Sequence, residues 1–277
     1  MTVPYAEVIG DPIAHSKSPL IHGFWLERLG ITASYGKSHV RGDALAAFFG
    51  GRRADPAWRG CNVTLPHKEA VAPFLDSIDP QAAAVGAVNT IYRGPEGALV
   101  GTNTDVNGVA DALAGLDLAG RVAVVLGAGG AAKAAFAHLA AQGCSEVRVL
   151  ARSPEKALHS AATCGLTVSA LPFIAATGAF AGAAAAINAT QLGMAGQEAM
   201  PGFVLEEIAT MTAKALVFDM VYVPLETELL IAADQHGHAT ADGLTMLIGQ
   251  AAIAFEKFFG QRPPREADAE LRAMLTA

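Results

Sequence analysis

Residues 122–133 read Val-Ala-Val-Val-Leu-Gly-Ala-Gly-Gly-Ala-Ala-Lys. The five apolar residues are typical of a buried strand, and the residues after the glycines favour a helix. Gly127 permits a tight turn, Gly129 lets the backbone approach a pyrophosphate, and the small Ala132 allows close helix–strand packing. A glycine pattern alone is equally typical of an ordinary turn. The flanking strand and helix therefore predict a dinucleotide-binding Rossmann unit, whose phosphate-binding turn and helix start comprise Gly127, Ala128, Gly129, Gly130 and Ala131.

The second expected strand of this unit, residues 147–150, indicates which dinucleotide binds. A site for NAD normally has Asp or Glu at the end of this strand, where the carboxylate binds the ribose hydroxyls. This chain has Ala151-Arg152-Ser153 instead, with Lys156 one helical turn further on. Arg152 and Lys156 would also be ordinary as solvated residues at a helix start. Their position after the glycine turn favours contact with a 2′-phosphate, to which Ser153 adds a donor, and so predicts NADP.

Strands and helices alternate from residue 122 onwards, which is typical of a parallel sheet. We expect strands at 122–126, 147–150, 184–188 and 215–219, and helices at 131–142, 154–163 and 244–259. Earlier in the chain, the pattern predicts strands at 5–9, 61–63, 87–92 and 99–100, a helix capped by Ser18, and helices near 44–49 and 66–75. We therefore expect an α/β protein with an N-terminal α/β part, a Rossmann-type doubly wound parallel sheet, and C-terminal helices that pack back on the N-terminal part.

The composition describes a globular protein. Of the 277 residues, 52% are hydrophobic and 16% charged, and the net charge is -7 without a basic run. This balance argues against a disordered chain and gives no footprint for nucleic acid. The alanine-rich residues 175–189 are too short for a membrane span, and residues 1–11 resemble neither a signal nor a transit peptide. We therefore expect a cytoplasmic protein without a membrane segment.

The three cysteines, Cys61, Cys144 and Cys164, lie far apart in the sequence. An odd number without CxxC or Cys/His spacing argues against a disulfide framework and against a zinc site. We expect free thiols and no metal.

Two polar clusters in the N-terminal part border expected helices. Residues 10–19 form a loop with Ser16 and Ser18, whose hydroxyls suit a carboxylate beside a helix N-terminus. Capping by Ser18 alone would explain only one of the two serines. In residues 60–68, a short strand ends in polar residues that include Thr64, and the expected helix then presents Lys68.

Two further polar clusters, residues 88–90 and 101–105, lie at expected turns after strands and carry Asn89 and Asp105. A lysine beside a carboxylate can donate or take a proton as a carbonyl is reduced, and amides and hydroxyls can recognise a polyol. Each of these residues, taken alone, is more often a surface or turn residue than a catalyst. Together they favour a site for a polyhydroxylated carbonyl compound.

The ordered motifs of the whole chain closely resemble those of the shikimate dehydrogenase family. They are SKSP at 16–19, NVTLPHK at 62–68, AVNT at 87–90, NTD at 103–105, GAGGAAKA from Gly127, NATQLGM from Asn188, DMVYVPLET from Asp219 and DGLTMLIGQAA from Asp242. The chain departs from the family at a few positions, such as Gly23 and Ala151, and none of these departures involves Lys68 or Asp105.

The resemblance implies NADPH-dependent, reversible reduction of 3-dehydroshikimate to shikimate, a step of aromatic amino-acid biosynthesis. It implies that Lys68 protonates or polarises the carbonyl oxygen, while Asp105 orients a substrate hydroxyl and holds the charge of the lysine. It also implies a substrate-binding domain at residues 1–105, a Rossmann domain for NADP at 106–240, and C-terminal helices at 241–277 that return to the first domain.

The remaining site residues are assigned by the same resemblance. Those that contact substrate or frame its pocket are Ser16, Ser18, Thr64, Asn89, Tyr222 and Gln250. Met220 and Gly243 would line the nicotinamide side. Gly243, Met246 or Leu247, and Gln250 recur at helical spacing, so Gln250 would point into the site; as a polar residue at the wet edge of a packed helix it would be equally ordinary.

Two alternatives remain open at this point. A quinate or quinate/shikimate dehydrogenase shares the Lys68 and Asp105 pair but often uses NAD, which Arg152 argues against. A non-catalytic NADP-binding sensor would keep the Rossmann half without chemistry, which the intact catalytic pair argues against. The expected partners are small molecules, with neither nucleic acid nor membrane, and the chain is expected to be a monomer or a homodimer.

Overall fold

The computed structural model describes residues 2–277. The chain forms two compact units: the residues up to Thr104 together with Gln250–Ala277, and Asp105–Gly249. Each unit contains a six-stranded sheet, and the predicted α/β fold class is confirmed. The C-terminal residues belong with the N-terminal unit, as expected. The functional domains at 1–105, 106–240 and 241–277 stay a prediction; by contacts alone, the second boundary falls after residue 249.

The sheet of the first unit mixes parallel and antiparallel pairs in the order β2-β1-β3-β5-β6-β4. Its strands are β1 (Tyr5–Gly10), β2 (Ser34–His39), β3 (Trp58–Val63), β4 (Ser77–Ile78), β5 (Thr90–Arg93) and β6 (Leu99–Thr102). Because β5 runs antiparallel to both β3 and β6, its start at Thr90 lies beside Asn62 and Thr102. The ends of β1, β3 and β6 and the start of β5 therefore share one edge of the sheet.

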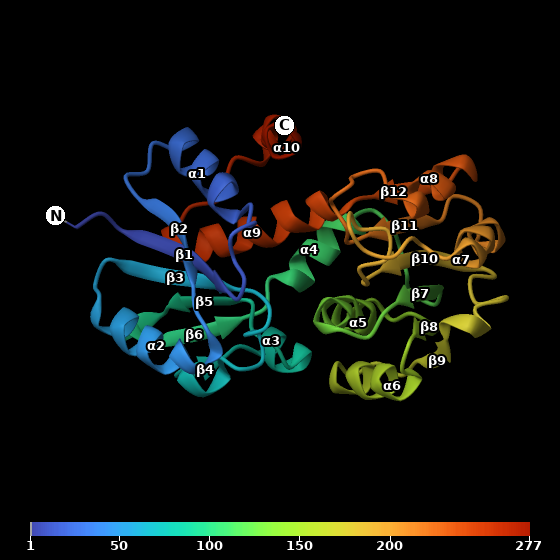
Figure 1. Cartoon of the computed structure of the whole chain (residues 1–277), viewed down its shortest axis with the longest axis horizontal. Coiled ribbons are helices and arrows are strands. Elements are labelled where there is room, and N and C mark those ends of the chain that lie inside the picture. Colours follow the sequence, from blue (N-terminus) through green and yellow to red (C-terminus); the bar gives the residue numbers. More distant parts are fainter. Residues whose placement is uncertain (1) are drawn as a thin grey trace. The chain divides into compact units, whose positions relative to one another are not determined.

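Helices cover both faces of this sheet (Figure 1). They are α1 (Ser18–Arg28), α2 (Leu45–Ala54), α3 (Pro80–Val85), the later part of α9 (Gly243–Phe259) and α10 (Asp268–Thr276). On one face, Phe49 of α2 packs in a core with Trp58 and Ile91. On the other, Ala6 packs against Phe258 of α9. A Cβ at Gly60 would lie 2.6 Å from the Phe258 ring, so this strand position requires glycine.

Two local predictions in this unit are wrong. The helix expected near 66–75 is a series of turns followed by a 3-10 helix at Ala72–Phe74. The Lys68 carbonyl accepts the Val88 N–H at 2.8 Å, and this bond to another segment replaces helical pairing. Ser18 does not cap α1 but is its first residue, and the Ser16 hydroxyl accepts the Ser18 N–H at 3.3 Å. Strand β2 was not expected, because its sequence SYGKSH lacks an apolar alternation.

The sheet of the second unit is entirely parallel, in the order β12-β11-β10-β7-β8-β9. Its strands are β7 (Val122–Leu126), β8 (Glu146–Ala151), β9 (Ser169–Pro172), β10 (Ala183–Asn188), β11 (Leu216–Asp219) and β12 (Ala239–Ala241). Numbered from β7, this is the 3-2-1-4-5-6 strand order of dinucleotide-binding folds. The strand order reverses between β7 and β10, so the expected glycine turn lies at the point where such sheets bind ligands.

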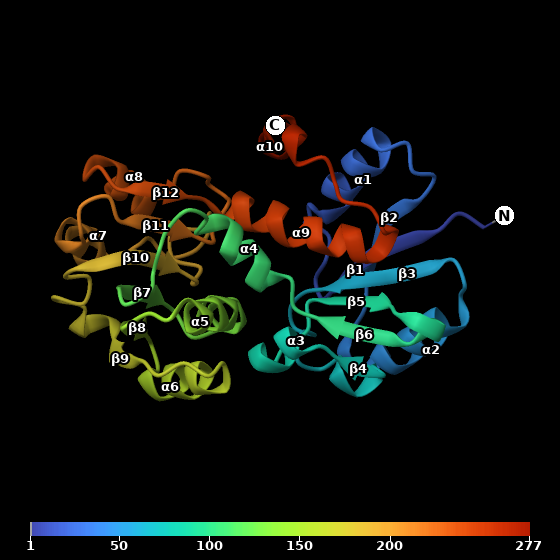
Figure 2. The same cartoon turned by 180° about the vertical axis from the view of Figure 1, so that it is seen from behind.

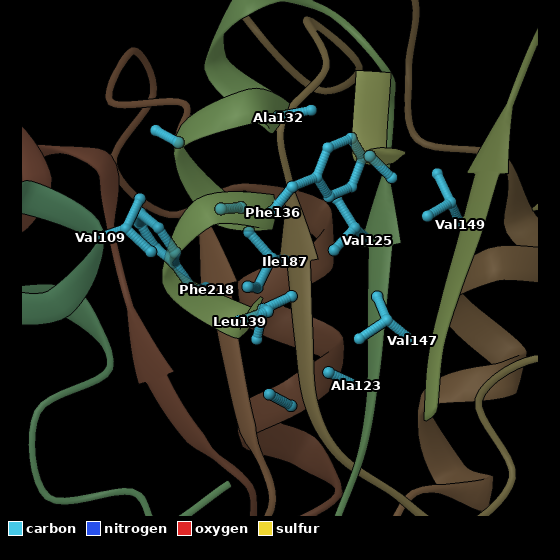
Figure 3. Close-up of a cluster of buried hydrophobic side chains, with 14 of the residues drawn as sticks. Val109, Ala123, Val125, Ala132, Phe136, Leu139, Val147, Val149, Ile187 and Phe218 are labelled. Carbon is cyan, nitrogen blue, oxygen red and sulfur yellow. The ribbon is translucent and has the colours of Figure 1, made fainter. Parts of the chain in front are cut away.

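Both faces of this sheet carry buried side chains. The helices that cover them can be followed in Figure 2, which views the chain from behind. One face is covered by α4 (Asp105–Ala112), α5 (Gly130–Gln142) and α6 (Pro154–Thr163). Figure 3 shows Phe136 and Leu139 of α5 among the buried side chains of β7, β8 and β10. The other face is covered by α7 (Gly202–Glu207) and α8 (Glu228–Gln235). No helix within residues 2–277 has the length and apolarity needed to cross a membrane.

Candidate active site

A buried network of polar side chains occupies the shared edge of the first sheet. The Asn89 carboxamide oxygen accepts the backbone N–H of Thr104 at 2.7 Å and the Thr90 hydroxyl at 3.0 Å, and the amide nitrogen donates to Thr104 Oγ1 at 3.1 Å. Thr104 Oγ1 lies 3.4 Å from Gln250 Oε1 of α9. Asn89, Thr104 and Gln250 are all buried. Because buried amides and hydroxyls are stable only when paired, the network fixes how these groups point.

The turn after β3 carries Thr64 and Lys68, and three contacts hold it. The Thr64 N–H donates to the Ile9 carbonyl at 3.0 Å, and the His67 N–H donates to the Thr64 carbonyl at 3.0 Å. The buried His67 ring lies with Nε2 2.6 Å from the Val40 carbonyl. Together with the Lys68 carbonyl bond to Val88, these contacts fix the backbone from which the half-buried Lys68 side chain projects.

The serine loop, residues 11–18, is held from several sides. His39 Nε2 of β2 lies 2.6 Å from an Asp11 carboxylate oxygen, and the Lys37 ammonium donates to the Ala14 carbonyl at 2.5 Å. The Lys17 ammonium donates to the Leu275 carbonyl of α10 at 2.7 Å. The loop therefore presents Ser16 and Ser18 from a backbone tied to β2 and to the C-terminal helix.

Asp105 follows directly on Thr104 and is the first residue of α4 and of the second unit. This residue is buried. A carboxylate in the first turn of a helix is stabilised by the positive end of the helix dipole. The bond from the Thr104 N–H to Asn89 fixes the backbone immediately before it.

The glycine turn of the second unit has the geometry that dinucleotide phosphates require. Gly127 has a φ of +105°, which favours glycine, and a Cβ there would lie 2.9 Å from Thr190 Cγ2. Gly129 precedes α5 and Gly130 begins it; both are exposed, and nothing lies within 4 Å of a Cβ placed on either. The N–H groups at the start of α5 are therefore open to a ligand, and a pyrophosphate would fit there.

The residues expected to select NADP lie at the end of β8 and the start of α6. Ala151 is buried as the last residue of β8, while Arg152, Ser153 and Lys156 are exposed. Ser153 is the N-cap of α6, as predicted, and its hydroxyl accepts the Lys156 N–H at 3.3 Å. Two exposed cationic side chains beside a helix N-terminus fit a phosphate group.

A second buried network positions Met220 and Tyr222. The Asp219 carboxylate accepts the Asn188 amide at 2.9 Å, the Thr227 hydroxyl at 2.7 Å and the Val221 N–H at 3.0 Å. Burial raises the pKa of Asp219, while these three hydrogen bonds oppose the rise. The Met220 N–H donates to the Asn188 carbonyl at 3.0 Å. The loop after β11 is therefore fixed where it carries the residues expected beside the nicotinamide and the substrate.

Gly243, the first residue of α9, packs directly against this loop. A Cβ at this position would lie 2.3 Å from the Met220 carbonyl oxygen and 2.8 Å from the carbonyl carbon of Val221. We expect Gly243→Ala to lower the free energy of unfolding by about 2 kcal/mol, because backbone must move to admit the methyl group. Chemical denaturation measures the change. The control is Gly202→Ala, which should change the stability little because a Cβ there meets open space and its φ is not positive.

The structure therefore brings some of the expected residues together. Within the first unit, the buried network joins Asn89 and Gln250. The other expected residues of this unit are carried by the serine loop, with Ser16 and Ser18, and by the turn after β3, with Thr64 and Lys68. Asp105, Tyr222, Met220, Gly243 and the residues of the cofactor site belong to the second unit.

Sequence analysis placed Asn62 and Thr90 in polar clusters but assigned a role to neither of them. Their positions at facing strand ends indicate that their side chains meet, and Asn62 Nδ2 donates to Thr90 Oγ1 at 2.9 Å. Tyr35, which donates to Asn62, was missed entirely, because its strand was not predicted.

Comparisons with known proteins point to the same family in each matched part of the chain. Three family models match: the shikimate dehydrogenase substrate binding domain over residues 8–91, shikimate / quinate 5-dehydrogenase over 109–199, and the shikimate 5′-dehydrogenase C-terminal domain over 243–270. The shikimate dehydrogenase (NADP(+)) of Sphingopyxis alaskensis is 51% identical over 274 residues, which cover 99% of this chain and 97% of that protein.

Solved structures give the same result for the fold. Shikimate 5-dehydrogenase from Thermus thermophilus, in complex with NADP(H) and shikimate, matches with a TM-score of 0.83 and 36% identity, over 98% of this chain and 99% of that one. The 5-ketofructose reductase of Gluconobacter sp. strain CHM43 matches with a TM-score of 0.87 and 29% identity, over 99% of both chains.

Proposed function

Because the chain belongs to the shikimate dehydrogenase family, we propose that Lys68 and Asp105 are its catalytic residues. The protein is an NADP-dependent oxidoreductase that reversibly reduces 3-dehydroshikimate to shikimate in aromatic amino-acid biosynthesis. The observation that best supports the assignment of residues is the buried network in which Asn89 binds the N–H of Thr104, the residue before Asp105.

Each catalytic residue has one role in reduction. NADPH, when bound, supplies a hydride to the carbonyl carbon. The Lys68 ammonium donates a proton to the carbonyl oxygen, which completes the alcohol, and the neutral amine regains its proton from solvent. Asp105 accepts a hydrogen bond from a neighbouring substrate hydroxyl and stabilises the protonated lysine. In the oxidation of shikimate the same groups act in reverse.

The substrate is held by residues of several elements. We assign the carboxylate to the hydroxyls of Ser16 and Ser18, with Tyr222 assisting, and the ring hydroxyls to Thr64, Asn89 and Gln250. Two serine hydroxyls next to the start of α1 are donors suited to a carboxylate. Burial raises the pKa of Tyr222, so its hydroxyl stays protonated and can donate.

The cofactor is assigned to the glycine turn and the end of β8. Residues 127–131 would hold the pyrophosphate, and Arg152, Ser153 and Lys156 the 2′-phosphate. Ala151 would border the adenosine, and Met220 and Gly243 the nicotinamide. The open N-terminus of α5 and the exposed cations support this assignment.

Location in the cytoplasm, and a monomeric or homodimeric state, are also part of the proposal. Light scattering on the purified chain distinguishes monomer from dimer.

The test of specificity is an absorbance assay at the nicotinamide band that crosses shikimate and quinate with NADP and NAD. We expect the highest kcat/KM for shikimate with NADP, because Arg152 replaces the acid of an NAD site. Activity confined to quinate and NAD would contradict both assignments. Binding of NADP without turnover of any pair would favour the sensor.

A further inference from the structure

Tyr35 lies on β2 and is connected to the buried polar network that contains Asn89. None of the motifs quoted from the sequence includes this residue. Its ring stacks on the His22 ring of α1, with centroids 3.9 Å apart and planes within 1°. Burial lowers the pKa of His22 to about 3, so the stack joins two neutral rings. Phe258 of α9 packs against both rings, at 6.2 Å from Tyr35 and 6.0 Å from His22. The ring of Tyr35 is therefore held in place without help from its hydroxyl.

The Tyr35 hydroxyl binds the amide at the end of β3. It donates to Asn62 Oδ1 at 2.6 Å. Burial raises the pKa of Tyr35 well above its ordinary value, so the hydroxyl keeps the proton that it donates to Asn62. This bond sets the direction in which the Asn62 amide points.

The orientation of Asn62 is passed on to Asn89 through Thr90. With Oδ1 facing Tyr35, Asn62 Nδ2 donates to Thr90 Oγ1 at 2.9 Å. Thr90 Oγ1 then donates its own hydrogen to Asn89 Oδ1 at 3.0 Å. The carboxamide oxygen of Asn89 thus accepts from the Thr90 hydroxyl as well as from the N–H of Thr104, so both bonds hold the amide in the same orientation. It leaves the nitrogen of Asn89 on the side of the Thr104 hydroxyl.

We propose that Tyr35 is a positioning residue of the substrate site, whose hydroxyl orients Asn89 through Asn62 and Thr90. This inference rests on the proposed function, because it matters only if Asn89 binds substrate. The four connected side chains come from β2, from β3 and from the segment that begins β5. A single donor therefore aligns groups from separate elements before substrate binds, which lowers the ordering cost of binding.

The test is Tyr35→Phe, which removes the hydroxyl and keeps the stacked ring. We expect the KM for 3-dehydroshikimate to rise about tenfold, because Asn62 Oδ1 loses its donor and the amides reorient. The KM for NADPH should stay within about twofold, since the cofactor site belongs to the other unit. A purely structural role would lower the melting temperature and the active fraction without this selective change in KM.

Tyr92→Phe is the matched control. Tyr92 lies on β5 of the same sheet, where its ring contacts the Lys257 ammonium at 4.8 Å from the ring centroid. Loss of its hydroxyl should leave both KM values unchanged. Equal KM values for substrate in Tyr35→Phe and the native chain would overturn the proposal.

Thr90→Val breaks the same connection on the far side of Asn62 and provides a second test if Tyr35→Phe folds poorly. We expect it to raise the substrate KM as well, and the double variant to raise it by less than the product of the two single effects. Fully multiplicative effects would mean that Tyr35 does not act through Thr90. Lys68→Ala, assayed alongside, separates failure of the proposed function from failure of this inference. An active Lys68→Ala variant would contradict the proposed function. An inactive Lys68→Ala variant, together with an unchanged substrate KM in Tyr35→Phe, would contradict only the role of Tyr35.

Discussion

Lys68→Ala is expected to lower kcat for reduction of 3-dehydroshikimate by about 10³-fold, because the carbonyl oxygen loses the positioned proton donor. The backbone of Lys68 would stay in place, since its carbonyl bond to Val88 and the His67 contacts do not involve the replaced side chain. Binding of NADPH should therefore persist. Stopped-flow or steady-state oxidation of NADPH measures kcat, and fluorescence titration measures cofactor binding.

Lys257→Ala is the matched control for loss of a lysine from the first unit. The Lys257 ammonium lies over the ring of Tyr92, and we assign it no role in the reaction. Its kcat should equal that of the native chain. If Lys68→Ala retained native kcat while binding both ligands, Lys68 would not be the proton donor.

The cofactor half was predictable from sequence because its signals are local and agree. The apolar strand, the glycines and the alanine-rich helix of residues 122–142 each specify the same geometry within one short segment. Ser153 is a further case, because an N-cap residue followed by Pro154 predicts the start of α6 from adjacent residues alone.

The substrate half was less predictable because its geometry depends on distant partners. Lys68 lies on a turn and not on a helix, since its carbonyl binds Val88 and His67 binds Val40, residues 20 or more positions away in sequence. Tyr35 and Asn62 are 27 positions apart, and Thr104 and Gln250 are 146 apart. The family motifs named several of these residues, but only the fold shows which of them hydrogen-bond to one another.

Replacement of both Arg152 and Lys156 by alanine is expected to lower kcat/KM for NADPH by about 100-fold, because the 2′-phosphate loses two charge-assisted hydrogen bonds. The value for NADH, which has no 2′-phosphate, should change by less than about threefold. Steady-state rates at saturating 3-dehydroshikimate, with each nucleotide varied in turn, give both values. The ratio of native to variant kcat/KM for NADPH should fall as the salt concentration rises. Salt screens the attraction between the exposed cations of the native chain and the 2′-phosphate, so the native chain loses part of its advantage.

Arg262→Ala controls for the loss of surface charge, because the Arg262 side chain is 86% exposed and lies in the first unit. It should leave the preference for NADPH intact. The decisive comparison is between the two nucleotides in the double variant. An equal loss with NADPH and NADH would mean that Arg152 and Lys156 support the fold or bind a group common to both cofactors. A loss confined to NADPH assigns the discrimination to these two side chains, at the position where an NAD site has a carboxylate.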